Sequence, residues 1–297
     1  METAEPVRRT PEIEEVTNLY VIHPIASRLT PLFAGLHIHP NAVSVAGMLF
    51  GVSAGVAYSQ YQDPRWTIAA FILMLAWHVM DGADGQLARL THSQSQSGKI
   101  LDGVCDYVTF IAVYTGLAVA LNRQHGDWVW VLVMAAGACH AVQAAAYETQ
   151  REEYNFWGWD RKSVALLELS APPRPAAASS VRRLADLLYH LYAKVQFRVA
   201  GVTVVFHKRM AAVLERRPER AGAIRQRYRE VFAPSIRQWS VMSGNYRTLG
   251  IFVCALAKAP LYYFWFEIIG FSVILVVLLF GQSARYALFL KDLEDVD

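Results

Sequence analysis

Residues 66–106 read WTIAAFILMLAWHVMDGADGQLARLTHSQSQSGKILDGVCD, an apolar run that leads into a group of acidic side chains. The run is long enough to cross a bilayer as a helix. Asp81, Asp84, Asp102 and Asp106 lie where this helix ends and the next one begins. Carboxylates at membrane depth are costly unless they face a polar cavity or bind cations. The stretch therefore predicts a membrane protein with a functional site at this turn.

The composition of the whole chain agrees with a membrane location. Of its 297 residues, 54% are apolar and 18% are charged, and its eight Trp and fourteen Tyr suit two membrane interfaces. The three cysteines fall in apolar segments without a C-x-x-C pair, so neither a disulfide framework nor a thiolate zinc site is expected. The first apolar run begins only near Asn41, so we expect no cleavable signal peptide and a cytoplasmic N-terminus.

Six stretches are long enough to cross a bilayer, which predicts an all-α integral membrane protein with six transmembrane helices. We place the helices near 40–60, 66–90, 98–121, 127–148, 246–265 and 267–290. Before them, Val16 to Leu36 mixes apolar and polar residues and predicts a helix lying in the headgroup layer.

A basic insert separates the fourth and fifth predicted helices. Between residues 152 and 246 there are sixteen Lys and Arg against eight Asp and Glu, whereas the whole chain carries a net charge of only +3. Apolar residues recur at helical spacing from Leu184 to Val202, which predicts a second interfacial helix. Positive loops stay in the cytoplasm, and a basic amphipathic face beside a membrane span favours anionic lipid over nucleic acid.

These features predict four regions along the chain. The sequence divides into an interfacial region at 1–39, helices 1 to 4 at 40–150, the basic cytoplasmic insert at 151–244, and helices 5 and 6 with the tail at 245–297.

Helix geometry brings the acidic side chains onto two faces. At about 100° per residue, Asp81 and Asp84 share a face with Gly85 and Ala88. On the next helix, Gly98, Asp102 and Asp106 are spaced four apart and also share a side. Clustered oxygen ligands favour hard divalent ions, either Mg²⁺ or Mn²⁺, and such ions usually serve a phosphate. The pattern therefore predicts phosphoryl transfer assisted by two metal ions.

The string from Asp81 to Asp106 has the form D-x2-D-G-x2-A-R-x8-G-x3-D-x3-D. It resembles the signature of the CDP-alcohol phosphotransferases, with no departure. The resemblance covers roughly residues 40–150 and 245–290 and implies six membrane helices, often in a homodimer. The basic insert has no counterpart in this resemblance.

The resemblance assigns roles to individual residues. It implies that the metal ligands are Asp81, Asp84, Asp102 and Asp106, with Asp106 also the general base. Gly98 would let the helices approach. Pro40-Asn41 with Ser44 resembles a further entry motif of the family that borders the nucleotide. The CDP site implied in this way consists of Asn41, Ser44, Asp84, Gly85, Ala88 and Arg89, where Arg89 can bind the diphosphate.

An acceptor pocket is less clearly marked in the sequence. Candidate side chains are His78, one turn before Asp81, together with His140, Arg247 and Lys258. A phosphorylated acceptor would need such cations, whereas a neutral alcohol would not. Arg247 is expected near the cytoplasmic interface, where snorkelling would also explain it, and Lys258 is expected deeper in the membrane.

Three functions compete at this point. The first is a bacterial-type phospholipid synthase of the plasma membrane, which takes CDP-diacylglycerol and a hydroxyl acceptor, releases CMP and faces the cytoplasm with its active site. The second keeps this chemistry but uses CDP-inositol or a CDP-aminoalcohol. The third is an ion-coupled transporter, in which the acids would bind a travelling cation. The spacing of the signature argues against the transporter.

Overall fold

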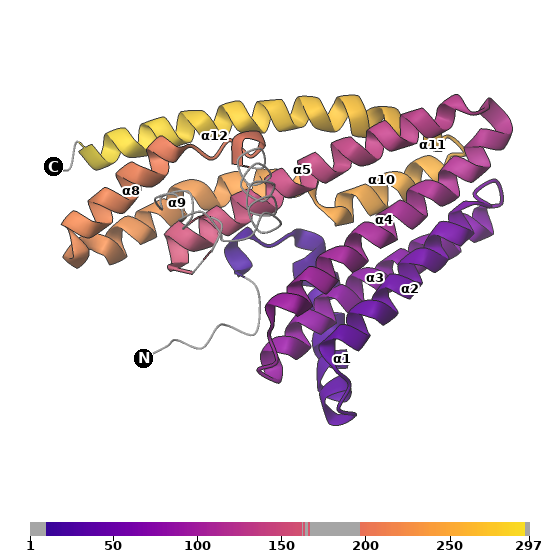
Figure 1. The fold of residues 1–297 in the computed structure, drawn as a ribbon, viewed down its shortest axis with the longest axis horizontal. Helices are drawn as coiled ribbons and strands as arrows, with labels where there is room; N and C mark the ends of the chain where they lie inside the picture. The colour runs from indigo at the N-terminus through magenta and orange to yellow at the C-terminus, as the bar shows by residue number, and fades with distance from the viewer. Residues whose placement is uncertain (1–9, 162, 164–165, 167–196, 295–297) are drawn as a thin grey trace, which may run out of the picture. The chain divides into compact units, whose positions relative to one another are not determined.

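The structure is a computed structural model, and it describes residues 10–161, 163, 166 and 197–294 of the chain. Within these residues every regular element is helical, which confirms the predicted all-α class. They form two compact units (Figure 1). Unit 1 comprises residues 1–140 and 244–270, and unit 2 comprises residues 141–243 and 271–297. One boundary between the units falls inside a helix, after His140, and the four regions predicted from sequence stay a prediction.

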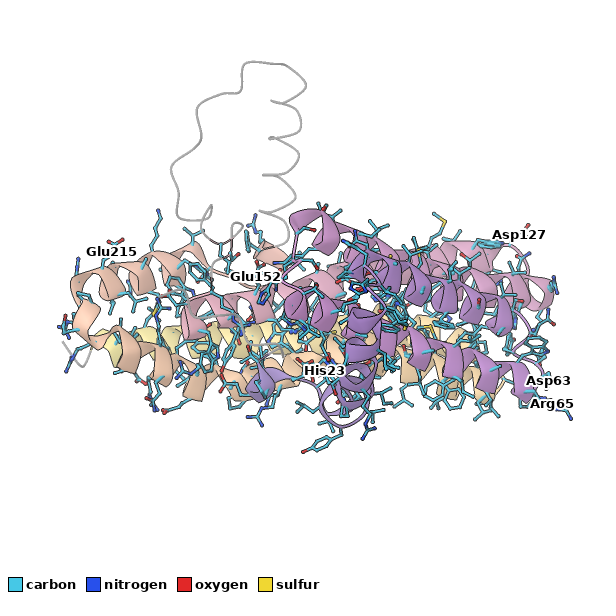
Figure 2. The ribbon with its side chains drawn as sticks, turned by 90° about the horizontal axis from the view of Figure 1, so that it is seen from below. His23, Asp63, Arg65, Asp127, Glu152 and Glu215 are labelled. Atoms are coloured by element: carbon cyan, nitrogen blue, oxygen red, sulfur yellow. The ribbon has the colours of Figure 1, made fainter. Side chains whose placement is uncertain are left out.

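Unit 1 contains the acidic residues. Its helices in chain order are η1 (Pro11–Ile13), η2 (Asn18–Ile22), α1 (His23–Gly35), α2 (Pro40–Tyr58), α3 (Pro64–Leu90), α4 (Gln96–His125), the first part of α5 (Trp128–Trp159), α10 (Gly244–Leu256), α11 (Pro260–Trp265) and η5 (Phe266–Gly270). Helices α2, α3 and α4 lie side by side (Figure 1). Figure 2 shows Asp63, Arg65 and Asp127 at the same end of this unit, so the α2–α3 and α4–α5 turns both lie at that end. The α3–α4 turn consequently lies at the opposite end, because α3 and α4 both run from one end to the other.

Five helices in the described residues are long and apolar enough to cross a membrane. They are Pro40–Tyr58, Pro64–Leu90, Ser97–His125, Trp128–Trp159 and Pro260–Leu293. The first four correspond to the first four predicted spans, although the fourth continues beyond residue 148. The sixth crossing and the sidedness that depends on it stay predictions.

The break between the last two predicted spans lies at a different place in the structure. The predicted break near residue 266 is wrong, because α11, η5 and α12 (Phe271–Glu294) follow one another without a gap. The chain breaks instead after Leu256, where Lys258 adopts a left-handed φ of 59°. Pro260 favours this break, because it has no N–H to continue a helix and restricts the residue before it. The 13 residues of α10 rise only about 20 Å, which is short of a bilayer core of about 30 Å.

The predicted N-terminal helix is present as η2 followed by α1. Tyr20, Leu32 and Leu36 are exposed on it, as expected for an apolar face without a protein partner. Its other side packs on α3, where a Cβ at Gly82 would contact Ile22 and Ala26. Its location in the headgroup layer stays a prediction.

Glycines allow α2 and α4 to approach closely. A Cβ at Gly51 would overlap Thr109, and one at Gly55 would overlap the backbone of Ala112. On the other helix, a Cβ at Gly116 would overlap the carbonyl oxygen of Gly55. Small residues at such a crossing permit the close backbone contact that stabilises helix pairs in membranes. This crossing fixes α4, which carries two of the four acids, against α2.

Unit 2 contains the rest of α5 with α8 (Val204–Arg216), η3 (Pro218–Arg220), α9 (Ala221–Trp239), η4 (Ser240–Met242) and α12. Its centre holds Glu153, which accepts hydrogen bonds from Tyr286 and lies 2.9 Å from Nε2 of His207. Glu153 and His207 are almost fully buried, so both need polar partners, which Tyr286 supplies to Glu153 and Trp157 supplies to His207 besides their contact with each other. Burial raises the pKa of the neighbouring Tyr228 well above its ordinary value, and the charge of Glu153 adds to this, so Tyr228 stays protonated.

Some arginines of the basic insert form hydrogen bonds and an ion pair inside unit 2. Arg225 donates to the carbonyl of Trp157 at 2.8 Å and pairs with Asp160, and Arg229 donates to the carbonyl of Gly158 at 2.7 Å. Both arginines thereby satisfy the last carbonyls of α5, as cations at a helix C-terminus do. The predicted interfacial helix from Leu184 to Val202 lies mostly outside the described residues, since description resumes at residue 197.

We expect Gly116→Ala to destabilise the protein by about 1 to 3 kcal/mol, because the added methyl group overlaps the backbone of α2. The measurement is the melting temperature of the purified protein in detergent. Gly35→Ala is the matched control, since a Cβ at Gly35 would have no atom within 4 Å. Equal melting temperatures for the two variants would contradict the close α2–α4 crossing.

Candidate metal centre

The turn between α3 and α4 is built from local hydrogen bonds. Thr91 Oγ1 donates to the carbonyl of Leu87 at 2.9 Å, and His92 adopts a left-handed φ of 53° that reverses the chain. Ser95 then caps α4, because its Oγ accepts from the N–H of Gly98 at 3.0 Å. This short polar turn sets the end of α3 beside the start of α4.

Three of the predicted ligands come together across this turn. Asp81 on α3 and Asp102 and Asp106 on α4 each offer a carboxylate oxygen, and these oxygens lie within 4.8 Å of one another. All three side chains are half-buried. The separation suits oxygen ligands around a small divalent cation, whose bonds are about 2.0 to 2.6 Å long. The two acidic faces predicted from helix periodicity therefore meet.

Asp84 has a different environment from the other three acids. It is buried, and Ser44 on α2 donates a short hydrogen bond to its Oδ2. It lines the same small cavity as the other three acids and Ser44, but it is not part of the group of three oxygens. The hydrogen bond from Ser44 to Asp84 therefore connects the predicted Pro40-Asn41 and Ser44 motif with the Asp81–Asp106 signature.

The other residues of the predicted CDP site are Asn41, Gly85, Ala88 and Arg89. Gly85, Ala88 and Arg89 are all partly exposed, and the Arg89 guanidinium covers Gly85, 3.5 Å from where a Cβ would be. Asn41 reaches the start of α4, because a Cβ at Gly98 would lie 3.4 Å from its Oδ1. Two small side chains and one guanidinium thus follow Asp84 on α3, and the amide of Asn41 lies beside the start of α4; their binding of the nucleotide stays a prediction.

Comparison with known families agrees with this geometry. The model of the family described as CDP-alcohol phosphatidyltransferase matches residues 37–206, which is more than half of the chain. The chain belongs to the CDP-alcohol phosphatidyltransferase family. The matched range contains every residue from Asn41 to Asp106 described above, and it confirms the family that the signature predicted.

Relatives within the CDP-alcohol phosphatidyltransferase family differ in their named substrates. Choline/ethanolaminephosphotransferase 1 of Arabidopsis thaliana is 32% identical over 122 residues, which cover 38% of this chain and 31% of that protein. The CDP-diacylglycerol-serine O-phosphatidyltransferase of Mycobacterium tuberculosis is 28% identical over 123 residues, 40% of each chain. Cholinephosphotransferase 1 of Gallus gallus is 27% identical over 114 residues, 36% of this chain and 32% of that protein. The alignments span less than half the length of these relatives.

Membership of a family of membrane enzymes fits the five apolar helices, and the chain is a multi-pass membrane protein. Its acidic centre lies at the ends of two of these helices.

Of the four residues predicted for the acceptor pocket, three are engaged by other side chains of unit 1. His78 is buried and its Nε2 lies 2.9 Å from Oγ1 of Thr248, while His140 Nδ1 lies 3.1 Å from the hydroxyl of Tyr114. Arg247 does not snorkel as expected, because it is fully buried and pairs with Glu267. Lys258 is exposed on the protein surface in the turn after α10, and its depth in the membrane stays a prediction.

Sequence reasoning missed two residues that line the acidic cavity and one buried acid elsewhere in unit 1. Trp77 and Cys105 line the cavity with the acids, and both lie on the acidic faces, Trp77 four residues before Asp81 and Cys105 three after Asp102. Helical spacing was enough to find them. Glu267 is the third, an acid inside an apolar run, which marks a functional candidate in a membrane helix. It was overlooked because the chain was expected to break beside it.

We expect Asp102→Asn to weaken Mn²⁺ binding by at least about ten-fold, because it removes one of three charged ligands from the group. Electron paramagnetic resonance of free Mn²⁺ in a titration of the purified protein measures this. Asp127→Asn is the control, because Asp127 lies in the turn at the opposite end of α4 (Figure 2). Equal affinities in the two variants would show that the three carboxylates do not bind the ion.

Proposed function

We propose that this protein is a membrane transferase that moves a phosphoalcohol group from a CDP-linked donor to a hydroxyl acceptor and releases CMP. The observation that carries the proposal is the meeting of Asp81, Asp102 and Asp106 within 4.8 Å, in a family signature at the ends of two membrane helices.

The residues fit divalent metal ions. Three carboxylates with Asp84 in the same cavity form a set of hard oxygen donors, which suits Mg²⁺ or Mn²⁺. Bound ions of this kind neutralise the diphosphate and stabilise the departing phosphate oxygen. In our proposal Asp81, Asp84, Asp102 and Asp106 hold them, and the hydrogen bond from Ser44 orients Asp84.

The remaining residues of the site bind the donor and move the proton. Arg89 is placed to form charge-assisted hydrogen bonds with the diphosphate, over the small side chains of Gly85 and Ala88. Asn41 borders the nucleotide. Asp106 accepts the proton of the acceptor hydroxyl as that oxygen bonds to the phosphorus of the phosphoalcohol group. The bond from this phosphorus to the CMP oxygen breaks in the same displacement, so CMP leaves with the electron pair.

We propose CDP-diacylglycerol as the donor, because the acidic centre lies on helices apolar enough to be embedded in lipid and a lipid donor can reach it from the bilayer. The M. tuberculosis relative is named for this donor. The product would then be a phospholipid.

The acceptor in this proposal is an alcohol that carries no phosphate. Arg247, one of the two cations predicted for the acceptor pocket, is fully buried and engaged by Glu267 at 3.1 Å. Lys258 lies after the far end of α10, about 20 Å from Gly244, which contacts His78. His78 lies one turn from Asp81 and is our candidate for the wall of the acceptor site. Serine, named for the mycobacterial relative, is an alcohol of the required kind.

We further propose a homodimer in a bacterial-type plasma membrane, with the site facing the cytoplasm and the basic insert on anionic lipid. Support for the sidedness is the excess of Lys and Arg between residues 152 and 246. Support for the dimer is the family resemblance alone.

The experiment that tests the function incubates purified protein and Mn²⁺ or Mg²⁺ with CDP-diacylglycerol, CDP-inositol, CDP-choline or CDP-ethanolamine, each with several acceptors. We expect CMP release with CDP-diacylglycerol and a non-phosphorylated alcohol such as serine, with the product identified by mass spectrometry. Transfer only to inositol phosphate or glycerol phosphate would overturn the proposed acceptor class. If none of the donors gives metal-dependent CMP release, the proposal that this protein is a transferase is wrong.

Asp106→Asn should lower the transfer rate by at least about 100-fold, because the amide cannot accept the acceptor proton. Single-turnover release of CMP measures the rate, at Mn²⁺ concentrations that saturate the variant so that weaker metal binding does not contribute. An unchanged melting temperature checks the fold, and near-normal turnover would remove Asp106 from the role of base.

A further inference from the structure

A chain of buried polar side chains runs through the apolar part of unit 1. Arg247 Nε donates to Glu267 Oε1 at 3.1 Å, and the hydroxyl of Tyr263 donates to Glu267 Oε2 at 2.6 Å. The hydroxyl of Tyr114 lies 3.2 Å from that of Tyr263 and 3.1 Å from Nδ1 of His140. We call these five residues the buried polar network.

The charged pair at the centre of this network is unusual for its surroundings. Arg247 and Glu267 are both 0% exposed, and the helices that carry them are largely apolar. A buried ion pair in such surroundings repays its desolvation only with good geometry and further hydrogen bonds, which Tyr263 supplies. Glu267 lies in the π-helical turn η5, and π-turns occur often at functional sites. Stability alone is a weak reason for such a pair.

The network reaches α4 below its acidic residues. Asp102, Asp106, Phe110 and Tyr114 are spaced four apart on α4, and each lies about 40° farther round the helix than the one before. Tyr114 is the polar group that ends this row, and its hydroxyl is held by Tyr263 and His140. The helix that carries two metal ligands is therefore anchored two turns beyond Asp106.

The network reaches α3 through the neighbour of Arg247. Thr248 Oγ1 lies 2.9 Å from His78 Nε2, and both side chains are buried. His78 lies one turn before Asp81 on α3. A Cβ at Gly244, in the first turn of α10, would also contact His78, so α10 packs directly on this part of α3. Both acid-bearing helices are thus held to the elements that the Arg247–Glu267 pair joins.

We propose that the buried polar network, with Thr248 attached to it, fixes the spacing of α3 and α4 and so holds their three carboxylates at the separation that binds divalent cations. Thr248 and Tyr114 are positioning residues in this scheme, since neither lines the acidic cavity. Ligand oxygens must keep their places within about 0.5 Å for tight binding, so a small shift of either helix changes the affinity. The inference rests on the proposed metal centre.

The test uses two substitutions that each remove one hydroxyl and keep the shape of the side chain, Tyr114→Phe and Thr248→Val. The controls are Tyr58→Phe on α2 and Thr67→Val at the start of α3. The Tyr58 hydroxyl is buried and has no hydrogen-bond partner in the described part of the chain, and the buried Thr67 hydroxyl donates to the carbonyl of Tyr61 at 3.1 Å, beside the turn at the end of α3 that is farther from Asp81. Each control therefore makes the same chemical change in unit 1 without touching the network.

Electron paramagnetic resonance of free Mn²⁺ gives the dissociation constant for each purified protein without any substrate. We expect Tyr114→Phe and Thr248→Val each to raise this constant by about ten-fold, the size seen when groups that orient metal ligands are removed. The two controls should stay within about two-fold of the parent protein, and Thr248→Ser, which keeps the hydroxyl, should restore binding.

Unchanged affinity in both network variants would overturn the inference, and so would an equal loss in the controls. If Tyr114→Phe fails to fold, the comparison of Thr248→Val with Thr248→Ser decides alone. Because the measurement needs no turnover, it separates this inference from the proposed function. An absence of CMP release together with the expected shifts in Mn²⁺ affinity would overturn only the transferase, whereas transfer with unshifted affinities would overturn only the inference.

Discussion

Four carboxylates at the ends of apolar helices impose the constraint on which the rest of this structure depends. Each would be costly in a low-dielectric environment by itself, so Asp81, Asp84, Asp102 and Asp106 have to share one polar cavity. Mutual repulsion opposes that arrangement unless cations or donors compensate. Ser44 supplies a donor to Asp84, and the group of three oxygens provides the geometry for cations. The need to place four carboxylates in one polar cavity therefore accounts for both the packing of these helices and the proposed metal chemistry.

Two kinds of packing hold this centre in place. On one side, the glycines of α2 and α4 bring the backbones into contact, so α4 has little freedom to move relative to α2. On the other, α10 holds α3 through the contact between Thr248 and His78, and the Arg247–Glu267 pair joins α10 to η5. The first uses close backbone contact and the second uses buried polar bonds. In lipid the hydrophobic effect does not drive helices together, so helices associate through close packing and polar contacts of these two kinds.

Much of the site was predictable because it is local in sequence. The spacing from Asp81 to Asp106 lies in two helices joined by a short turn, so periodicity alone placed the acids on facing sides. The acceptor residues were harder, because their environment depends on partners far along the chain. Arg247 was expected at the interface because it begins the predicted span 246–265, and its pairing with Glu267, 20 residues away, could not be seen in the pattern of that span. Lys258 was expected inside the same span, which ends earlier in the structure because Pro260 follows a turn.

The sequence by itself determined the helical membrane class, the family and the residues of the acidic centre, because these depend on hydropathy and on fixed spacing within two neighbouring helices. Only the tertiary structure decided which groups complete that centre and which are engaged elsewhere. It placed Ser44 on Asp84, engaged Arg247 with Glu267 and tied His78 to Thr248. These pairs join residues between 20 and 170 positions apart, and such contacts follow from how helices pack rather than from the pattern of any one helix.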